Sequence, residues 1–245
     1  MKKLILGLAL TAFGTGTALA QDVVRMGSEG AYPPYNFIND ATGELDGFER
    51  ELGDAICERA GLTCEWVIND WDTIIPNLVS GNYDTIMAGM SITDARREVI
   101  AFSQNYLQPE PSAFIALAGT DADVTMSGVV AAQSNTIQAG HIAESDADLL
   151  EFPTPDETIA ALRNGEVDAV LADKAFLEPY VGDSGGELVF LGDDVLLGDG
   201  IGVGTRQSDN DLRATFDGVI SEMKADGSLN TMITKWFGED QPLFE

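Results

Sequence analysis

The sequence predicts an α/β fold of two lobes, each a mainly parallel sheet flanked by helices, with two hinge crossovers between them. Short apolar stretches typical of strands alternate with stretches of helical periodicity, which favours parallel strands with helices on the sheet faces. The alternation breaks at residues 107–111, where Pro109 and Pro111 exclude a helix, and then restarts. The last strand and two helices are too small to fold alone, so we expect them to complete the first unit.

Five elements are predicted in the first unit: a strand at 23–27, a helix at 47–60, a strand at 65–68, a helix at 71–80 and a strand at 83–89. The first helix places Phe48, Leu52 and Ile56 on one face. Pro76 is compatible with the second helix only near its first turn, because proline lacks the N–H that the helix interior needs.

The second unit is predicted to contain strands at 114–117, 128–132 and 169–172 and helices at 137–143, 155–164 and 174–180. Residues 182–198 are rich in Gly and Asp and are expected to be a loop-bearing stretch. The returning segment contains a strand at 200–204 and helices at 209–226 and 228–237. Lobe 1 is therefore predicted to be residues 22–108 plus 199–245 and lobe 2 residues 109–198, with a ligand cleft between them.

Composition narrows the class of function. The chain has 245 residues, 44% hydrophobic, and 13 Lys+Arg against 41 Asp+Glu give a net charge of −28. So acidic a surface repels phosphate backbones, which argues against nucleic-acid binding and favours cationic small molecules. One histidine, His141, and two cysteines make a His/Cys metal centre or a Ser-His-Asp hydrolase hard to assemble. We expect no metal and no cofactor.

Residues 1–20 are typical of a signal peptide. Lys2 and Lys3 precede the short apolar run LILGLAL, and an A-x-A cleavage site ends at Ala20. The run is too short to span a bilayer as a stable helix, although an uncleaved anchor is the alternative. We expect an exported, soluble product that does not insert in the membrane after cleavage.

Cys57 and Cys64 lie seven positions apart. Gly61 can end the first helix between them and let the chain turn back, which brings the two residues within bridging range. In an oxidising compartment we expect a disulfide, which stabilises so small a loop by about 2–3 kcal/mol in the chain-entropy model. Two buried free thiols are the alternative. The spacing is not the C-x-x-C of redox-active pairs.

The segment 87–97 (MAGMSITDARR) carries the most informative pattern. A strand ends in small residues, and Ser91 or Thr93 caps a helix whose first turn carries Arg96. Backbone N–H groups, hydroxyls and a guanidinium then converge, and these groups can bind a carboxylate through two parallel hydrogen bonds. An ordinary capped helix with solvated arginines is the alternative.

Two further polar residues follow predicted strands. Asp173 can accept hydrogen bonds from an ammonium, or it can instead cap the helix that starts at Lys174. Thr136 can cap the next helix after a left-handed turn at Asn135 and offer its hydroxyl to a ligand carboxylate. His141 is assigned no chemistry.

Aromatic residues form a third group of candidates. Tyr32 and Trp71 can place a ring over the aliphatic or cationic part of a ligand, which contributes about 0.5–2 kcal/mol of cation–π attraction. Glu29 stands just before Tyr32 and can meet a positive side chain, unless it is one more solvated acid. Phe37 is assigned to the core.

These residues make the chain recognisable. It resembles the periplasmic solute-binding proteins of polar amino-acid ABC transporters (solute-binding protein family 3), with most similarity to the lysine/arginine/ornithine- and histidine-binding branch. The resemblance covers nearly all of the mature chain and is carried by GAYPPYNF, ELDGFERELGDAICERAG, WDTIIPNLVSGNYDTIMAGMSITDARREVIAFS and DLRATFDGVISEMKADGSLNTMITKWFG. It implies the type II periplasmic binding protein fold. The cysteine spacing also matches the disulfide of the basic-amino-acid branch.

The resemblance implies that Arg96 holds the α-carboxylate of a ligand, with help from Ser91 and Thr136. It implies that Asp173 holds the α-ammonium. Asn135 stands where the family commonly has the Gly of a Gly-Thr pair.

The same resemblance places Tyr32 and Trp71 on either side of the ligand side chain and Glu29 where cation-binding members often have an acid. Gly89 and Ala88 occupy positions that often hold Ser or Thr, so they offer backbone groups only. We expect Gly89 to belong to the site.

The resemblance implies a monomeric periplasmic receptor without catalytic activity that delivers an L-amino acid to an inner-membrane ABC permease. The ligand would be cationic, such as arginine, lysine, ornithine, histidine or an opine-like derivative. The alternatives are a periplasmic cyclohexadienyl (prephenate/arogenate) dehydratase on the same fold and a ligand-sensing partner of a receptor.

Overall fold

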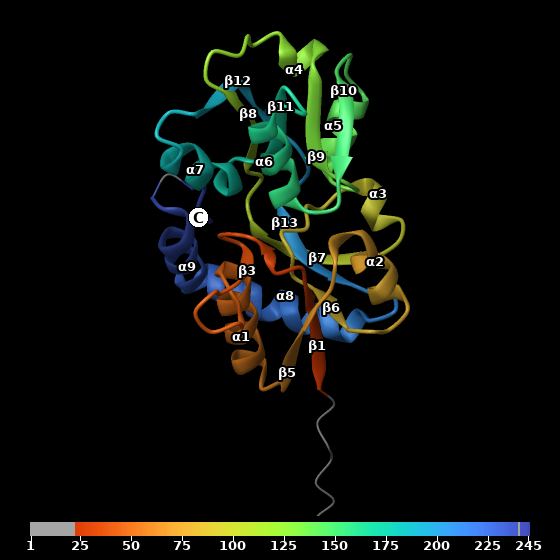
Figure 1. Cartoon of the computed structure of the whole chain (residues 1–245). Coiled ribbons are helices and arrows are strands. Elements are labelled where there is room, and N and C mark those ends of the chain that lie inside the picture. Colours follow the sequence, from red (N-terminus) through yellow and green to blue (C-terminus); the bar gives the residue numbers. More distant parts are fainter. Residues whose placement is uncertain (1–22, 240) are drawn as a thin grey trace, which may run out of the picture.

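The structure, a computed structural model, describes residues 23–239 and 241–245. Within these residues the chain forms two five-stranded sheets and one three-stranded sheet. Figure 1 shows the large sheets in two lobes, one holding the beginning and the end of the described chain (red to yellow, and blue) and the other its middle (green and cyan). The predicted two-lobed α/β fold is confirmed. The exact lobe boundaries stay a prediction, and the predicted signal peptide at 1–20 lies outside the described residues.

The first large sheet contains β1 (Val24–Ser28), β5 (Cys64–Ile68), β6 (Thr85–Ile86), β7 (Ala101–Leu107) and β13 (Ile201–Thr205). Its order is β5-β1-β6-β13-β7. β1 runs parallel to β5 and β6, whereas β13 runs antiparallel to β6 and β7. The returning strand therefore lies inside this sheet, and the sheet is mixed rather than mainly parallel.

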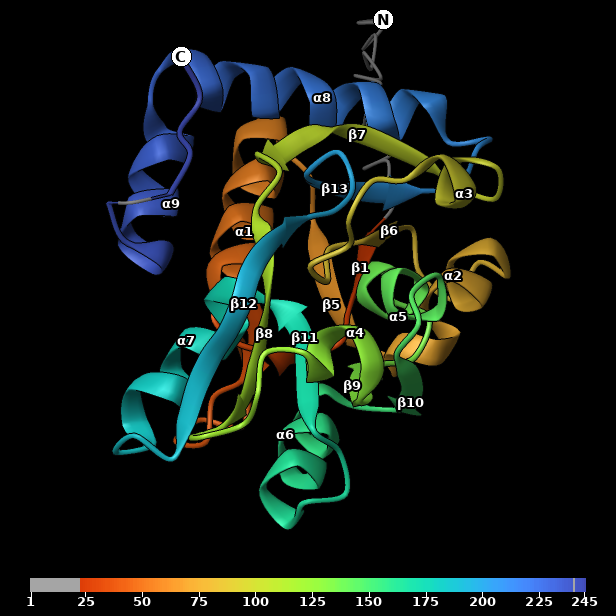
Figure 2. The same cartoon turned by 90° about the horizontal axis from the view of Figure 1, so that it is seen from above.

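The helices associated with this sheet are α1 (Phe48–Ala60), α2 (Trp71–Val79), α3 (Asp94–Arg97), α8 (Asn210–Ala225) and α9 (Ser228–Phe237). Figure 2 shows α8 lying along β7, and α8 also packs against α1. Phe48, Leu52 and Ile56 are fully buried, as the helical pattern predicts. Pro76 lies in the second turn of α2, which corrects the first-turn expectation. Burial of the helix's apolar face, with Ile74 at its centre, keeps it helical past the proline.

The second large sheet contains β8 (Pro111–Leu117), β9 (Val129–Gln133), β10 (Asp148–Phe152), β11 (Ala169–Asp173) and β12 (Leu188–Leu196), in the order β10-β9-β11-β8-β12. This sheet is also mixed, since β9 is parallel to β10 and β11 and β8 is antiparallel to β11 and β12. Its helices are α4 (Val124–Ser127), α5 (Ile137–Ala143), α6 (Pro155–Asn164) and α7 (Lys174–Asp183). The small sheet joins β2 (Ala31–Tyr32), β3 (Asn36–Ile38) and β4 (Leu45–Asp46).

Several elements correct the sequence prediction. The expected loop at 182–198 contains β12. This strand was not predicted because its exposed residues Asp193 and Asp194 are typical of a loop. β7 was not predicted because register shifts opposite β13 break its alternation of buried and exposed residues. β10 and the one-turn helix α4 were also not predicted from the sequence. The strand expected at 83–89 is reduced to β6, and Gly89 turns the chain with φ 61°.

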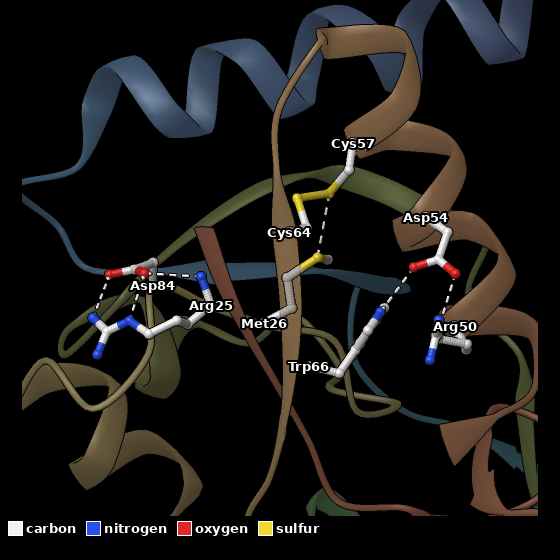
Figure 3. Close-up of a disulfide and its surroundings, with 8 residues drawn as sticks. All are labelled: Arg25, Met26, Arg50, Asp54, Cys57, Cys64, Trp66 and Asp84. Carbon is white, nitrogen blue, oxygen red and sulfur yellow. Dashed lines mark hydrogen bonds and ion pairs between the residues drawn. A yellow bond between two sulfur atoms is a disulfide. The ribbon is translucent and has the colours of Figure 1, made fainter. Parts of the chain in front are cut away.

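The predicted disulfide between Cys57 and Cys64 is present, with the two Cα atoms 6.2 Å apart. Figure 3 shows it joining the end of α1 to the start of β5, beside Met26 of β1. Gly61 ends α1 in the left-handed conformation with φ 66°, as the sequence indicates. Across the described ranges, no helix has both the length and the apolar character needed to cross a membrane.

Candidate ligand-binding site

A cavity lined by residues of both lobes lies between them. The carboxyl ends of strands from both sheets meet there, since Glu29 follows β1, Gln133 ends β9 and Asp173 ends β11. All eight predicted ligand-binding residues line this cavity: Glu29, Tyr32, Trp71, Gly89, Ser91, Arg96, Thr136 and Asp173. Their roles toward a ligand stay predictions.

Arg96 is held in place by the turn that precedes α3. Thr93 caps this helix, because its Oγ1 accepts a hydrogen bond of 3.2 Å from the Arg96 backbone N–H. The guanidinium donates from Nη1 to the carbonyl of Ser91 (2.8 Å) and from Nη2 to the carbonyl of Asn135 in the other lobe (3.2 Å). It also lies 5.3 Å from the centre of the Trp71 ring. Two of its five N–H donors are thereby used, which leaves three for an anion.

The Arg96 guanidinium stays charged at neutral pH. Burial lowers its pKa to about 10, and Asp173 opposes the shift. A partly buried cation without a directly bonded carboxylate is costly, so the cavity favours an anionic group beside Arg96.

Asp173 stands at the N-cap position of α7, but its side chain makes no capping hydrogen bond, so the capping alternative is wrong. Its Oδ2 accepts a hydrogen bond of 2.9 Å from the hydroxyl of Tyr32, and its Oδ1 accepts one of 3.0 Å from Nε2 of Gln138. Burial raises the pKa of Asp173 to about 6. The carboxylate is thus oriented by side chains from both lobes and can accept hydrogen bonds from an ammonium.

Glu29 lies on the same cavity, opposite the end of β9. Its Oε1 accepts a hydrogen bond of 2.6 Å from Nε2 of Gln133. Burial raises the pKa of Glu29 to about 7, and the acids Asp70 and Asp72 add to the shift. Glu29 is therefore a partly buried acid that a cation would stabilise in its ionised form.

The two aromatic candidates lie in different surroundings. Tyr32 stacks on Phe176 with ring centres 4.4 Å apart, whereas Trp71 has Arg96 on its ring. Phe37 is only half-buried against Trp236, which corrects its assignment to the core, because β3 belongs to the small sheet near the surface.

Hydrogen-bonding groups of Gly89 and Thr136 that were expected to face a ligand are already bonded within the protein. The Gly89 N–H donates 2.7 Å to Oε1 of the fully buried Glu49, so this glycine can offer a ligand its carbonyl but not its N–H. The Thr136 hydroxyl donates to the carbonyl of Gln133 (2.7 Å) and accepts from the Ala139 N–H (3.1 Å), which caps α5.

Sequence reasoning missed Gln133, Gln138 and Glu49. Gln133 had one detectable signal, since it ends a predicted strand at the edge where Asp173 ends another. Gln138 and Glu49 lie inside helices and contact the site only through the tertiary fold.

Hydrogen bonds outside the cavity also join the lobes. Oδ1 of Asp72 on α2 accepts from Oγ of Ser134 (2.6 Å) and from Nδ2 of Asn135 (2.9 Å). At the crossover before β8, the Tyr35 hydroxyl donates to Oε2 of Glu110 at 2.5 Å. The lobes are therefore in direct contact around the cavity.

Comparisons with known proteins agree with this architecture. The model for bacterial extracellular solute-binding proteins, family 3, matches residues 24–239. The lysine/arginine/ornithine-binding periplasmic protein of Escherichia coli (strain K12) is 33% identical over 97% of each chain. The octopine-binding periplasmic protein of Rhizobium meliloti is 33% identical over 92% of this chain and 94% of the relative.

A solved structure extends the comparison. The periplasmic His/Glu/Gln/Arg/opine family-binding protein from Silicibacter pomeroyi, in complex with lysine, is 68% identical, covers 90% of this chain and 100% of its own, and superposes with a TM-score of 0.87. The chain belongs to the bacterial extracellular solute-binding proteins, family 3.

Proposed function

We propose that this protein is the periplasmic substrate-binding component of an amino-acid ABC importer and that its interlobe cavity binds an L-amino acid with a cationic side chain. The observation that carries the proposal is a pair of opposite charges on one cavity. The Arg96 guanidinium has unused donors for an α-carboxylate, and the Asp173 carboxylate can accept from an α-ammonium.

The positions of Arg96 and Asp173 also explain why a ligand would favour closure of the two lobes. Arg96 belongs to an element packed on the first sheet, whereas Asp173 ends a strand of the second. A ligand that contacts both residues stabilises the closed arrangement over any arrangement in which the lobes are apart. We infer a hinge-closing receptor that works as a monomer and passes its ligand to an inner-membrane permease.

The charge of the cavity favours a cationic ligand. Glu29 and Asp173 carry two negative charges when ionised, and Arg96 carries one positive charge. An amino acid with an ammonium or guanidinium side chain has a net charge of +1 and neutralises the remainder. The lysine bound to the 68%-identical Silicibacter protein supports this ligand class, as do the lysine/arginine/ornithine- and octopine-binding names of the other two relatives.

We propose a binding role without catalysis. The relatives reported above carry the names of binding proteins, and none of those names supports a cyclohexadienyl dehydratase. Incubation with prephenate or arogenate should therefore yield no product.

Calorimetric titration of the refolded mature protein with arginine, lysine, histidine, glutamine and glutamate tests the ligand class. We expect micromolar or tighter binding of at least one cationic member and much weaker binding of glutamate. Silence across the whole panel, or tight binding of glutamate alone, would contradict the proposal.

A further inference from the structure

Gln133 is fixed in a single orientation beside the candidate site. The residue is 8% exposed, and its Nε2 donates to Oε1 of Glu29 (2.6 Å) and to the carbonyl of Pro153 (3.1 Å). Both neighbours are acceptors, so the NH₂ group and not the amide oxygen must face them. Gln133 belongs to the second sheet and Glu29 follows the first, so the hydrogen bond also crosses the cleft.

Glu29 has no cation of its own. Within the described part of the chain, no ion pair includes Glu29, and the charges that act most on it are the acids Asp70, Asp72 and Glu49. The positive charge of Arg96 interacts electrostatically with Asp173 instead. The amide of Gln133 satisfies one oxygen of Glu29 but leaves its charge uncompensated.

We propose that Gln133 is a specificity-determining residue: its neutral amide orients Glu29 without neutralising it, which reserves the charge of Glu29 for the side-chain cation of the ligand. This inference rests on the proposed function and deepens it. The charge of residue 133, more than the shape of the cavity wall, then sets whether the site prefers a cationic or a neutral side chain.

The direct test is Gln133→Lys, which places an ammonium beside Glu29. We expect the ratio of lysine affinity to glutamine affinity to fall by about 100-fold or more, because the new cation pairs with Glu29 and repels the ligand cation at close range. The ratio is measured by calorimetry with L-lysine and L-glutamine at pH 8.

Gln133→Met is the matched control. It removes both hydrogen bonds and keeps the length of the side chain but adds no charge. Both affinities are expected to fall, while their ratio stays within about threefold of the wild-type value, since the charge balance of the cavity is unchanged. A ratio that collapses equally in the methionine variant would overturn the role of charge at this position.

Gln133→Glu is expected to raise the ratio of lysine affinity to glutamine affinity. It tests the inference even if the Gln133→Lys variant does not fold. A second carboxyl beside Glu29 makes the cavity more negative at pH 8, so the lysine-to-glutamine ratio should rise by about tenfold. An unchanged or lower ratio in this variant would overturn the inference.

The wild-type titrations separate the two proposals. Failure of the wild-type protein to bind lysine, arginine and histidine would overturn the proposed function together with this inference. Selective lysine binding by the wild type, with a ratio in Gln133→Lys within threefold of wild type, would overturn only the inference.

Discussion

Nη2 of Arg96 donates a hydrogen bond of 3.2 Å to the carbonyl oxygen of Asn135, and this contact joins the two lobes at the edge of the cavity. Asn135 has φ 58°, the one positive value among the non-glycine residues of the described chain. The left-handed turn was expected from the sequence, because asparagine tolerates it better than most residues. The turn directs the carbonyl of Asn135 to Arg96 and its side-chain amide to Asp72. Placement of the guanidinium is therefore coupled to contact between the lobes.

Asp72 is predicted to act as a latch on the closed arrangement. Asp72→Ala removes the acceptor of the Ser134 and Asn135 side chains, whose hydrogen bonds exist only when the lobes are together. Such exposed bonds contribute about 1 kcal/mol, so calorimetry should show about fivefold weaker binding of both lysine and arginine.

Asn135→Gly is the partner variant for this test. Glycine keeps the left-handed turn without strain but lacks the amide, so a smaller loss is expected, and the two losses should not add in the double variant. A change at Asp72 that weakens one ligand tenfold more than the other would show a direct ligand contact and contradict the latch.

Binding of lysine is predicted to strengthen as the pH rises. Burial raises the pKa of Glu29 to about 7 and that of Asp173 to about 6, and the cationic groups of lysine favour the ionised form of both acids. Protons therefore compete with the ligand below these values, and the affinity should fall steadily from pH 8 to pH 5.

Calorimetry at pH 6.5 in buffers of different ionisation enthalpy should register net proton release on lysine binding. In Glu29→Gln the part of the pH dependence near pH 7 should disappear. An affinity that is constant between pH 5 and pH 8 would contradict the assignment of these acids.

Glu49 is predicted to hold the Gly89 turn. Its buried carboxylate accepts hydrogen bonds from the Asn36 amide (2.7 Å), the Gly89 N–H (2.7 Å) and the Tyr106 hydroxyl. Glu49→Gln places an NH₂ group against at least one of these donors, so urea unfolding should show a free energy of unfolding lower by about 2–3 kcal/mol. Glu58→Gln, an exposed position on the same helix, should stay within about 0.5 kcal/mol of wild type. Equal effects of the two variants would contradict this role.

The disulfide is predicted to stabilise the fold without touching the site. Replacing Cys57 and Cys64 by serine should lower the free energy of unfolding by about 2–3 kcal/mol, since the closed loop is short. Neither residue lines the cavity, so lysine affinity under native conditions should be unchanged. A tenfold loss of affinity would show that the bond shapes the cavity as well.

Local patterns in the sequence were enough to predict the alternating elements, the return of the last strand to the first sheet and the position of Arg96. Capping preferences and strand ends are short-range features, and they place Arg96 and Asp173 without knowledge of the tertiary fold. The antiparallel edge strands β7 and β12 were not predictable in this way. β12 has acids on an exposed face and β7 has bulges, and both strands exist because of their partners.

The hydrogen-bond partners of the site residues could not be predicted from the sequence either. Gln133, Gln138 and Glu49 are ordinary polar residues in the sequence, and their partners Glu29, Asp173 and Gly89 lie 104, 35 and 40 positions away. No periodicity or motif records such pairings, because the tertiary fold creates them, within a lobe for Gln138 and Glu49 and between the lobes for Gln133.

The most direct test of the amino-acid clamp is calorimetric titration of Arg96→Ala with lysine, beside Arg97→Ala as an exposed control one residue away. Removal of a partly buried cation that binds a ligand carboxylate costs about 3 kcal/mol, so Arg96→Ala should bind lysine about 100-fold more weakly than wild type. Arg97→Ala should bind as wild type does, and both variants should unfold cooperatively. Near-native lysine affinity in folded Arg96→Ala would contradict the account.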